Sequence, residues 1–217
     1  MEVLVPETER DEYAQKIPNP LLTVPDSIEG LGRLRNWVLD NFDEETIVMV
    51  DDDITHFYAL TGPKTRDIKD PDEVMQVIIN TAVMAKDAGC NCFGFAQTDI
   101  RKYSATEPFK LNSWVGCIIG VIGRKYRFRD DKFKVDIDFC LKNLLGTRIL
   151  WQDARYYAAQ NRDNNLGGNA KFRTKEGFEQ SLYSLQKRWG TSIKVRDHKG
   201  QVNIKLNVAR RQTIKYE

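Results

Sequence analysis

Three consecutive aspartates are the sharpest chemical feature of the sequence. Asp51, Asp52 and Asp53 directly follow residues 46–50, which are β-branched and apolar and are predicted to form a buried strand of the parallel type. Adjacent carboxylates repel one another and lose hydration on burial unless a counter-ion is present. Ligands bind beyond the carboxyl ends of strands in open α/β sheets. The D-x-D pair Asp51 and Asp53 is therefore predicted to hold Mn²⁺ or Mg²⁺ with substrate phosphates, and the alternative is a solvated acidic turn.

Two further pairs of polar residues lie near the expected ends of helices. Arg35 and Asn36 are in the first turns of a helix predicted over residues 31–42, where a guanidinium and an amide could reach a nucleotide or its phosphates. Asp136 and Asp138 alternate with apolar residues just before a helix predicted over residues 139–145. A carboxylate in half-apolar surroundings can act as a general base, whereas the alternative for Asp138 is that it caps the helix.

A segment rich in Asn and Gly, residues 161–169, is predicted to be a long loop. Glycines allow close backbone approach to a ligand, and such loops often act as lids, although an ordinary surface loop fits equally well. The candidate binding residues in and beside this loop are Arg155, Tyr156, Gln160, Asn161, Arg162, Gly167, Gly168, Asn169 and Arg173. His56 and His198 are candidate metal ligands that fit a surface role better.

The elements around these residues indicate one α/β domain. Strands are predicted at residues 3–6, 21–24, 46–50, 92–96, 114–122 and 148–151, and helices at 7–15, 31–42, 71–87, 139–145 and 177–189. Residues 192–195 and 201–206 are predicted to pair as a hairpin. Strands alternate with helices in the first half, which is typical of a parallel sheet. A single domain over residues 1–217 follows, with residues 175–217 as a C-terminal extension of one helix and a hairpin.

Composition excludes a disordered chain and indicates no membrane span. The chain has 217 residues, of which 41% are hydrophobic and 29% charged, and its net charge is +2. No signal peptide and no long apolar run are present, and four cysteines in apolar runs fit buried free thiols, so a cytoplasmic protein is expected. Two basic stretches, residues 124–129 and 187–215, could meet phosphates, or they could be solvated surface.

Taken in order, these motifs resemble those of GT-A glycosyltransferases and, more narrowly, the TET-associated glycosyltransferases of bacteriophages. The resemblance covers residues 3–173. It depends on the motifs at residues 30–37 (GLGRLRNW), 48–53 (VMVDDD), 135–142 (VDIDFCLK), 155–157 (RYY) and 167–169 (GGN). It implies a GT-A fold, which is a Rossmann-like mixed sheet flanked by helices that binds a nucleotide-diphospho-sugar.

The resemblance also implies roles for individual residues. Asp51 would face the nucleotide ribose, Asp53 would bind the metal, and Asp138, with Asp136 beside it, would be the candidate base at the acceptor. The expected contacts to the nucleotide-sugar come from Arg35, Asn36, Asp51, Asp52, Arg155, Gly168, Asn169 and Arg173.

The implied substrates are a UDP-sugar donor and a 5-hydroxymethylated pyrimidine in DNA, in the host cytoplasm if a phage encodes the chain. The basic stretches would contact that DNA, and the base would be flipped out or single-stranded. GT-A domains usually begin with a strand and a loop that holds the nucleobase, but residues 3–7 look like the second strand. That leaves a homo-oligomer open, in which another chain completes the site. The alternatives are a nucleotidyltransferase, against which the lack of a glycine-rich phosphate loop counts, and a non-catalytic DNA-binding module.

Overall fold

The computed structural model describes residues 1–61, 64–97, 107–130, 134–161, 174–198 and 201–208. The helices are η1 (Glu7–Glu9), α1 (Arg10–Ala14), α2 (Leu31–Asn41), α3 (Pro71–Asp87), α5 (Val135–Thr147), α6 (Lys175–Trp189) and η3 (Gly190–Ser192). The strands are β1 (Val3–Pro6), β2 (Leu21–Val24), β3 (Thr46–Val50), β4 (Ile54–Ala59), β5 (Arg66–Asp67), β6 (Cys92–Ala96), β7 (Phe109–Lys110), β8 (Ile118–Ile122), β9 (Trp151–Gln160), β10 (Ile193–His198) and β11 (Gln201–Leu206).

A seven-stranded mixed sheet forms the centre of the molecule. Its strand order is β3-β8-β6-β9-β4-β5, with β7 paired to β9. Only β6 and β9 run parallel, and the other pairs are antiparallel. The mixed sheet flanked by helices is confirmed, whereas the parallel direction predicted for β3 is wrong. An apolar run shows that a strand is buried but does not show which way its neighbour runs.

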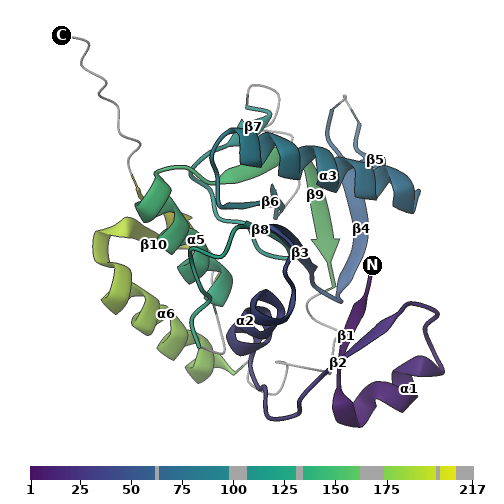
Figure 1. The fold of residues 1–217 in the computed structure, drawn as a ribbon. Coiled ribbons are helices and arrows are strands. Elements are labelled where there is room, and N and C mark those ends of the chain that lie inside the picture. The colour runs from purple at the N-terminus through teal and green to yellow at the C-terminus, as the bar shows by residue number, and fades with distance from the viewer. Residues whose placement is uncertain (62–63, 98–106, 131–133, 162–173, 199–200, 209–217) are drawn as a thin grey trace.

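Helices cover the two faces of this sheet (Figure 1). Their apolar side chains belong to separate clusters. On one face α3 packs through Ile78 against Phe57 and Phe95 of the sheet. On the other face Leu39 of α2 and Phe139 of α5 belong to the cluster that contains strand residues of β6 and β8. The apolar face of each helix therefore faces the sheet, as amphipathic helices require.

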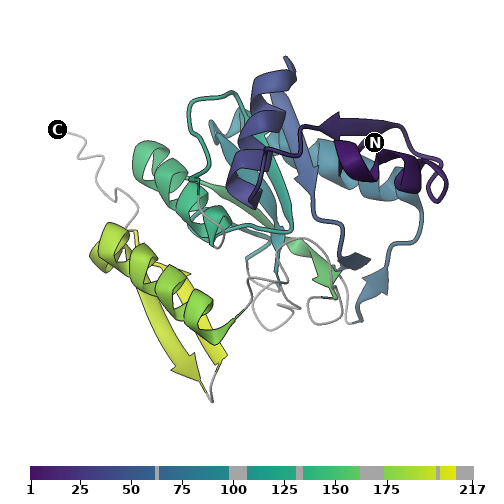
Figure 2. The ribbon, with the colours of Figure 1, turned by 90° about the horizontal axis from the view of Figure 1, so that it is seen from below.

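The C-terminal helix and hairpin form a further layer beside α5 (Figure 2). Leu185 of α6 and Ile193 and Leu206 of the β10–β11 hairpin are buried in the same cluster as Leu141 of α5. The hairpin is the one predicted from the sequence, and it is antiparallel with Ile193 opposite Leu206. This layer thus shares its apolar core with the sheet domain.

The N-terminal strands form a small unit of their own. β1 and β2 pair in parallel, with Val3 opposite Leu21, and the short helices η1 and α1 connect them. Among the described residues neither strand joins the seven-stranded sheet. A first strand–helix–strand unit is therefore present but short.

Several boundaries differ from the sequence-based predictions. Helix α5 begins at Val135 instead of residue 139, because Lys134 takes a left-handed backbone (φ 57°) and the chain turns helical directly after it. Strand β8 begins only at Ile118, and β9 runs from Trp151 to Gln160 although residues 148–151 were predicted. Strands β4, β5 and β7 were not predicted. Many residues in β4 and β9 are polar or aromatic, so periodicity alone did not reveal them.

Candidate functional site

The three aspartates cross over the end of β6. The Asp51 amide donates to the Cys117 carbonyl at 2.8 Å, and the Asn161 amide donates to the Asp53 carbonyl at 2.9 Å. The segment therefore starts against the strand on one side of β6 and ends against the strand on the other side. In a flat sheet β3 and β4 would lie about 19 Å apart, but four residues reach at most about 14 Å. The sheet must be curled, which brings the ends of β3 and β4 together (Figure 1).

Asp51 and Asp53 share one hydrogen-bond donor. The Gln160 side-chain amide nitrogen lies 2.8 Å from Oδ1 of Asp53 and 3.4 Å from Oδ2 of Asp51. On the other side, Nη2 of Arg35 donates to Oδ1 of Asp51 at 2.9 Å, and the Arg35 side chain is only 4% exposed. Asp52, between the two, is exposed. The structure therefore brings Arg35, Asp51 and Asp53 together, with the two carboxylates facing the Gln160 amide group.

Asp136 and Gln97 form the neighbouring side of the site. If Gly116 carried a Cβ atom, Oδ2 of Asp136 and Oε1 of Gln97 would each lie 3.0 Å from it, so both oxygens gather above this glycine. Gln97 directly follows β6, and Asp136 is in the first turn of α5. The Asp136 carboxylate is close enough to Asp51 to raise the pKa of Asp51. We call the set Arg35, Asp51, Asp53, Gln97, Asp136 and Gln160 the aspartate site.

The electrostatics of the aspartate site are unbalanced. The pKa of Asp51 is raised to about 6: burial is the main cause, the Arg35 guanidinium opposes the rise, and the charges of Asp136 and Asp53 add smaller upward contributions. Nη1 of Arg35 and Oε1 of Gln97 are buried without a hydrogen-bond partner among the described residues. Unpaired buried polar atoms are costly, and these two are in a position to exchange hydrogen bonds with a ligand in the site.

The donor set suits a divalent cation. No group of three or more His, Cys, Asp or Glu side chains in the described part of the chain surrounds a single point. Asp51 and Asp53 nevertheless aim two carboxylate oxygens at the Gln160 amide nitrogen, where a cation would replace it. Gln160 could then turn its amide and offer Oε1 as a third oxygen. Oxygen ligands of this kind are those that Mg²⁺ and Mn²⁺ take, together with phosphate oxygens.

Asp138 lies on the other side of α5 and is buried at 2% exposure. Its Oδ1 accepts from Nε1 of Trp189 at 2.8 Å and lies 3.3 Å from Nε of Arg188, both in α6. Nζ of Lys142 lies 3.0 Å from Oδ2. Residues two apart on a helix point about 200° apart, so Asp138 faces α6 while Asp136 faces the site. The capping alternative for Asp138 is wrong, because α5 has Lys134 as its N-cap.

The Asn36 side chain forms two hydrogen bonds with the backbone of one residue, Phe128. Its Nδ2 donates to the Phe128 carbonyl at 3.0 Å, and its Oδ1 accepts from the Phe128 amide at 2.9 Å. These two bonds fasten the chain after β8 to α2. The structure does not turn the Asn36 side chain toward the aspartates.

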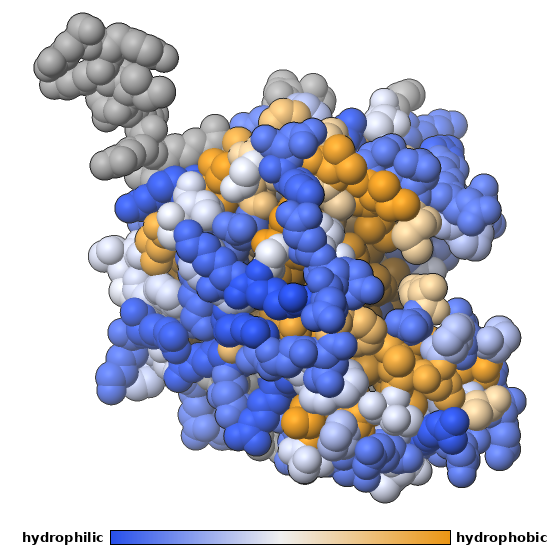
Figure 3. All heavy atoms as spheres, viewed as in Figure 1, coloured by the Kyte–Doolittle hydropathy of each residue, from blue (hydrophilic) through white to orange (hydrophobic). Residues whose placement is uncertain are grey.

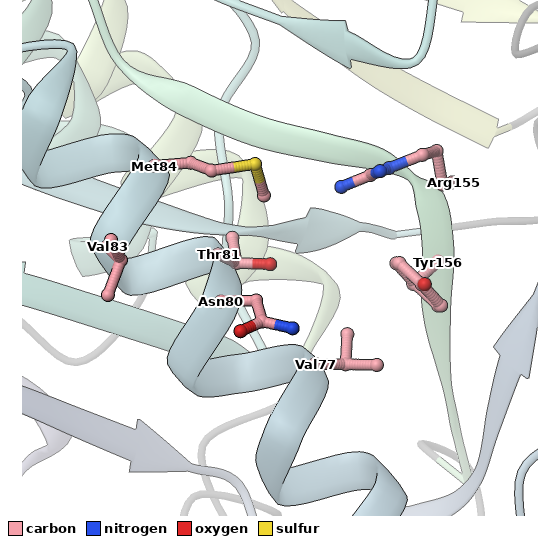
Figure 4. Close-up of a pocket in the computed structure, with 7 residues that line it drawn as sticks. All are labelled: Val77, Asn80, Thr81, Val83, Met84, Arg155 and Tyr156. Carbon is pink, nitrogen blue, oxygen red and sulfur yellow. The ribbon is translucent and has the colours of Figure 1, made fainter.

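Arg155 also lies away from the aspartate site. Its Nε and Nη2 donate to the two carboxylate oxygens of Asp153 at 3.0 and 2.7 Å. It lines a hollow of about 380 Å³ between β9 and α3, where it extends toward Met84 while Tyr156 lies near Val77 (Figure 4). Apolar side chains gather on the surface around α3 (Figure 3).

The remaining candidates have different outcomes. Gly168, Asn169 and Arg173 lie outside the described residues, as do Arg162 and Gly167. Nδ1 of His56 lies 3.1 Å from Asp67, and the side chain of His198 is not described. The four buried free thiols are confirmed, and they are Cys90, Cys92, Cys117 and Cys140.

The basic stretch over residues 124–129 is mostly folded onto the protein. Arg124 donates to the Phe42 and Glu44 carbonyls, and Arg127 pairs with Asp40 at 2.7 Å. These contacts tie the stretch to the end of α2, which leaves it less available for phosphates than the sequence suggested.

The hairpin carries a second basic surface. Lys194, Arg196 and Lys205 are exposed, and Lys194 is directly opposite Lys205 in the antiparallel register. Like charges in this position destabilise a sheet unless an anion lies nearby. The hairpin therefore remains a candidate phosphate-binding surface.

Two residues of the site were missed as ligands by the sequence-based predictions. Gln97 was not considered, and Gln160 was named only as a residue beside the long loop. Both lie where a strand ends, Gln97 just after β6 and Gln160 as the last residue of β9. The rule that drew attention to Asp51 would have found Gln97, since it also follows a short buried strand.

Comparison with known proteins supports the reading of the motifs. A model of the TET-associated glycosyltransferase family matches residues 1–168, which include every member of the aspartate site. No curated protein and no solved structure matches the chain. No helix in the described ranges has the length and apolar character needed to cross a bilayer. The match disfavours the nucleotidyltransferase and the non-catalytic DNA-binding module. The chain belongs to the TET-associated glycosyltransferase family and is a glycosyltransferase with a mixed α/β fold.

Proposed function

We propose that this glycosyltransferase is metal-dependent and uses the aspartate site to hold the diphosphate of a nucleotide-sugar. The observation that carries the proposal is the Gln160 amide nitrogen, which lies within hydrogen-bond distance of both Asp51 and Asp53. Mn²⁺ or Mg²⁺ at that point would be held by Asp51 and Asp53. When bound, such a cation stabilises negative charge on a departing diphosphate.

Arg35 is the second positive group for the donor. Its Nη2 is engaged by Asp51, but its buried Nη1 has no partner among the described residues. A phosphate oxygen is a strong acceptor for a guanidinium, because two parallel hydrogen bonds can form. We therefore propose that the donor diphosphate binds on the α2 side of the aspartates and that the donor is a UDP-sugar, with Asp51 near its ribose.

We assign the acceptor base to Asp136 and a positioning role to Asp138. Asp136 lies beside Gln97 above Gly116 and interacts with Asp51, so a hydroxyl in the site can reach it. A base within hydrogen-bond reach can take the proton of the attacking hydroxyl as the bond to the sugar forms. Asp138 is buried against Trp189 and acts only by fixing α5 to α6.

The proposed acceptor is a hydroxymethylated pyrimidine of DNA, in flipped or single-stranded form. The hairpin supports a DNA partner, because Lys194, Arg196 and Lys205 present three exposed cations on neighbouring strands. Each contact between a cation and a phosphate releases counter-ions, so binding through this surface would weaken as salt rises.

Thermal melting with Mn²⁺ and a panel of nucleoside diphosphates and nucleotide-sugars tests the donor proposal. A ligand that binds only the folded state must raise the melting temperature. We expect a rise with a uridine diphosphate compound that needs Mn²⁺ and disappears in Asp53→Ala. The matched control is Asp43→Ala, which removes an exposed aspartate outside the site and should keep the rise. Equal shifts in wild type and Asp53→Ala would contradict the proposal.

A further inference from the structure

Three aromatic rings stack in a row across β4 and β9. The ring centroids of His56 and Tyr58 lie 5.4 Å apart at an interplanar angle of 24°, and those of Tyr58 and Tyr157 lie 4.9 Å apart at 25°. Tyr58 and Tyr157 are also direct partners in the strand register. We call these three residues the ring ladder.

The ring ladder adjoins the aspartate site. β4 begins directly after Asp53, so His56 is only three residues from that carboxylate. At the other end, Tyr58 and Tyr157 pack against Ala96, whose neighbour in the chain is Gln97. Side chains alternate along a strand, and Phe57 faces α3, so His56 and Tyr58 project from the opposite face.

The His56 ring is both held and accessible. Its Nδ1 lies 3.1 Å from Oδ2 of Asp67 in β5, which restrains the ring, while 49% of the His56 side chain is exposed. A restrained aromatic ring loses little conformational entropy when a flat ligand stacks on it. The exposed end of the ladder thus suits a planar ligand better than a flexible one.

We propose that the ring ladder is the platform on which the acceptor base of a nucleic acid stacks. This inference depends on the proposed function, since it supplies the acceptor side of that reaction. The donor belongs on the side of Arg35, because the buried, unpartnered Nη1 lies there. Asp51 follows β3 and pairs with Arg35, whereas Asp53 leads directly into β4, so a base on His56 approaches the aspartates from the Asp53 side.

We favour a nucleic-acid base as the ligand, because its flat aromatic ring can stack on the exposed end of the three stacked rings. Base-on-aromatic stacking tolerates differences in sequence, because every base has a flat π-face. Such a platform would bind the base itself, whereas the hairpin cations would bind phosphates. The two contributions can therefore be separated by removing the bases and keeping the phosphates.

Fluorescence anisotropy with a labelled single-stranded pyrimidine oligonucleotide tests the platform. An abasic oligomer with the same number of phosphates is the second probe. We expect His56→Ala to weaken oligonucleotide binding about 5- to 150-fold, as loss of one stacked ring predicts, and His56→Phe to restore most of it. Binding of the abasic oligomer should be the same in all three proteins.

The matched control is Phe109→Ala. Phe109 is another exposed aromatic residue, 43% exposed and stacked on Trp151 at 4.5 Å, but it pairs with the opposite end of β9. Its loss should leave oligonucleotide binding unchanged. Unchanged binding in His56→Ala, or equal weakening in His56→Phe, would overturn the platform.

Two further outcomes separate this proposal from the proposed function. If His56→Ala lowers the affinity for a UDP-sugar with Mn²⁺ and not for the oligonucleotide, the ladder holds the donor base and the proposal is wrong. If the donor still stabilises the protein in a manner that needs Asp53 while His56 variants change nothing, only the platform fails and the donor site remains.

Discussion

The half-buried carboxylate of Asp51 and the fully buried carboxylates of Asp138 and Asp153 have surroundings that are opposite in kind. Asp138 and Asp153 are matched by cations: Asp138 by Lys142 and Arg188, and Asp153 by a bidentate bond from Arg155. At the aspartate site Asp51 has one guanidinium but two neighbouring carboxylates. A paired buried charge holds elements together, whereas crowded carboxylates with one counter-ion cost stability until a cation arrives. The first arrangement is structural, and the second is the one for which we propose a cation.

The sharpest test of this comparison is a pair of variants in one helix, Asp136→Asn and Asp138→Asn. We expect Asp136→Asn to lower turnover about 100- to 10,000-fold, because the proton acceptor is lost, while the melting temperature stays near that of the wild type. Asp138→Asn should chiefly lower the melting temperature. Initial rates with saturating donor and thermal melts of both proteins check it, and the reverse ranking would contradict the assignment of the base.

Removal of the whole Asp138 side chain should give the largest loss of stability. Asp138→Ala leaves Nε1 of Trp189 without its acceptor and leaves Lys142 and Arg188 facing one another, so we expect the free energy of unfolding to fall by about 2–4 kcal/mol. Urea titration followed by circular dichroism measures it. Asp138→Asn should fall between the alanine variant and the wild type, because its amide oxygen still accepts from Trp189.

The pH dependence of metal binding should reveal the raised pKa of Asp51, which burial and the neighbouring carboxylates cause. Its pKa is raised to about 6, so Mn²⁺ affinity should be flat above that pH and fall about tenfold per unit below it, as protonation competes with the cation. Isothermal titration across pH 5 to 7 checks this. Without metal the sign reverses: the folded state takes up the proton first, so stability should decrease as pH rises from the unfolded pKa of Asp51 to about 6.

Asp51→Asn is the control for the metal-free stability slope. An amide does not titrate, so this variant should lose the part of the stability change that belongs to Asp51. A metal-free wild-type protein that becomes more stable over the same rise in pH, with the variant flat, would contradict the raised pKa.

The smallest expected effect comes from Gly116→Ala. A methyl group there would lie 3.0 Å from the Asp136 and Gln97 oxygens and would shift them by a few tenths of an ångström. Displacements of this size at reacting groups reduce rates, and we expect about a tenfold loss of turnover. Mn²⁺ affinity should hardly change, since the atoms nearest to that methyl group belong to Asp136, Gln97 and Trp114 and not to Asp51 or Asp53. Equal losses of both would show that the two halves of the site are not separable.

Much of the fold followed from local patterns. Alternation, helical spacing and capping predicted β1, β2, α2, β3, α3 and β6, and the Asp70 side chain caps α3 as expected, accepting from the Asp72 amide at 3.0 Å. The direction of strands did not follow, because pairing between distant segments decides it. Strand β9 was underestimated since its buried residues include Gln152 and Asp153, whose burial depends on tertiary partners.

The candidate site was predictable only in part. Asp51 and Asp53 could be predicted as site residues, because adjacent carboxylates after an apolar strand repel one another and lose hydration unless a counter-ion is present. The roles of Asp136 and Asp138 depended on where α5 begins. The left-handed backbone of Lys134 moved that start by four residues, and on a helix such a shift decides which acid faces the sheet edge. Gln160 has no local signature at all, since only the curled sheet brings it to Asp53.

The passage of residues 51–53 over β6 also determines when the site can exist during folding. Its ends are held by Cys117 and Asn161, which are synthesised long after the aspartates, so closure joins distant parts of the chain. Contacts of such long range form slowly and require most of the sheet to be in place. In a nascent or partly unfolded chain the three carboxylates would repel one another, and the contacts to Cys117 and Asn161 that position them for a ligand would not yet exist. A nucleotide-sugar would then bind only after the sheet is complete, and it should protect β3 and β9 together from proteolysis.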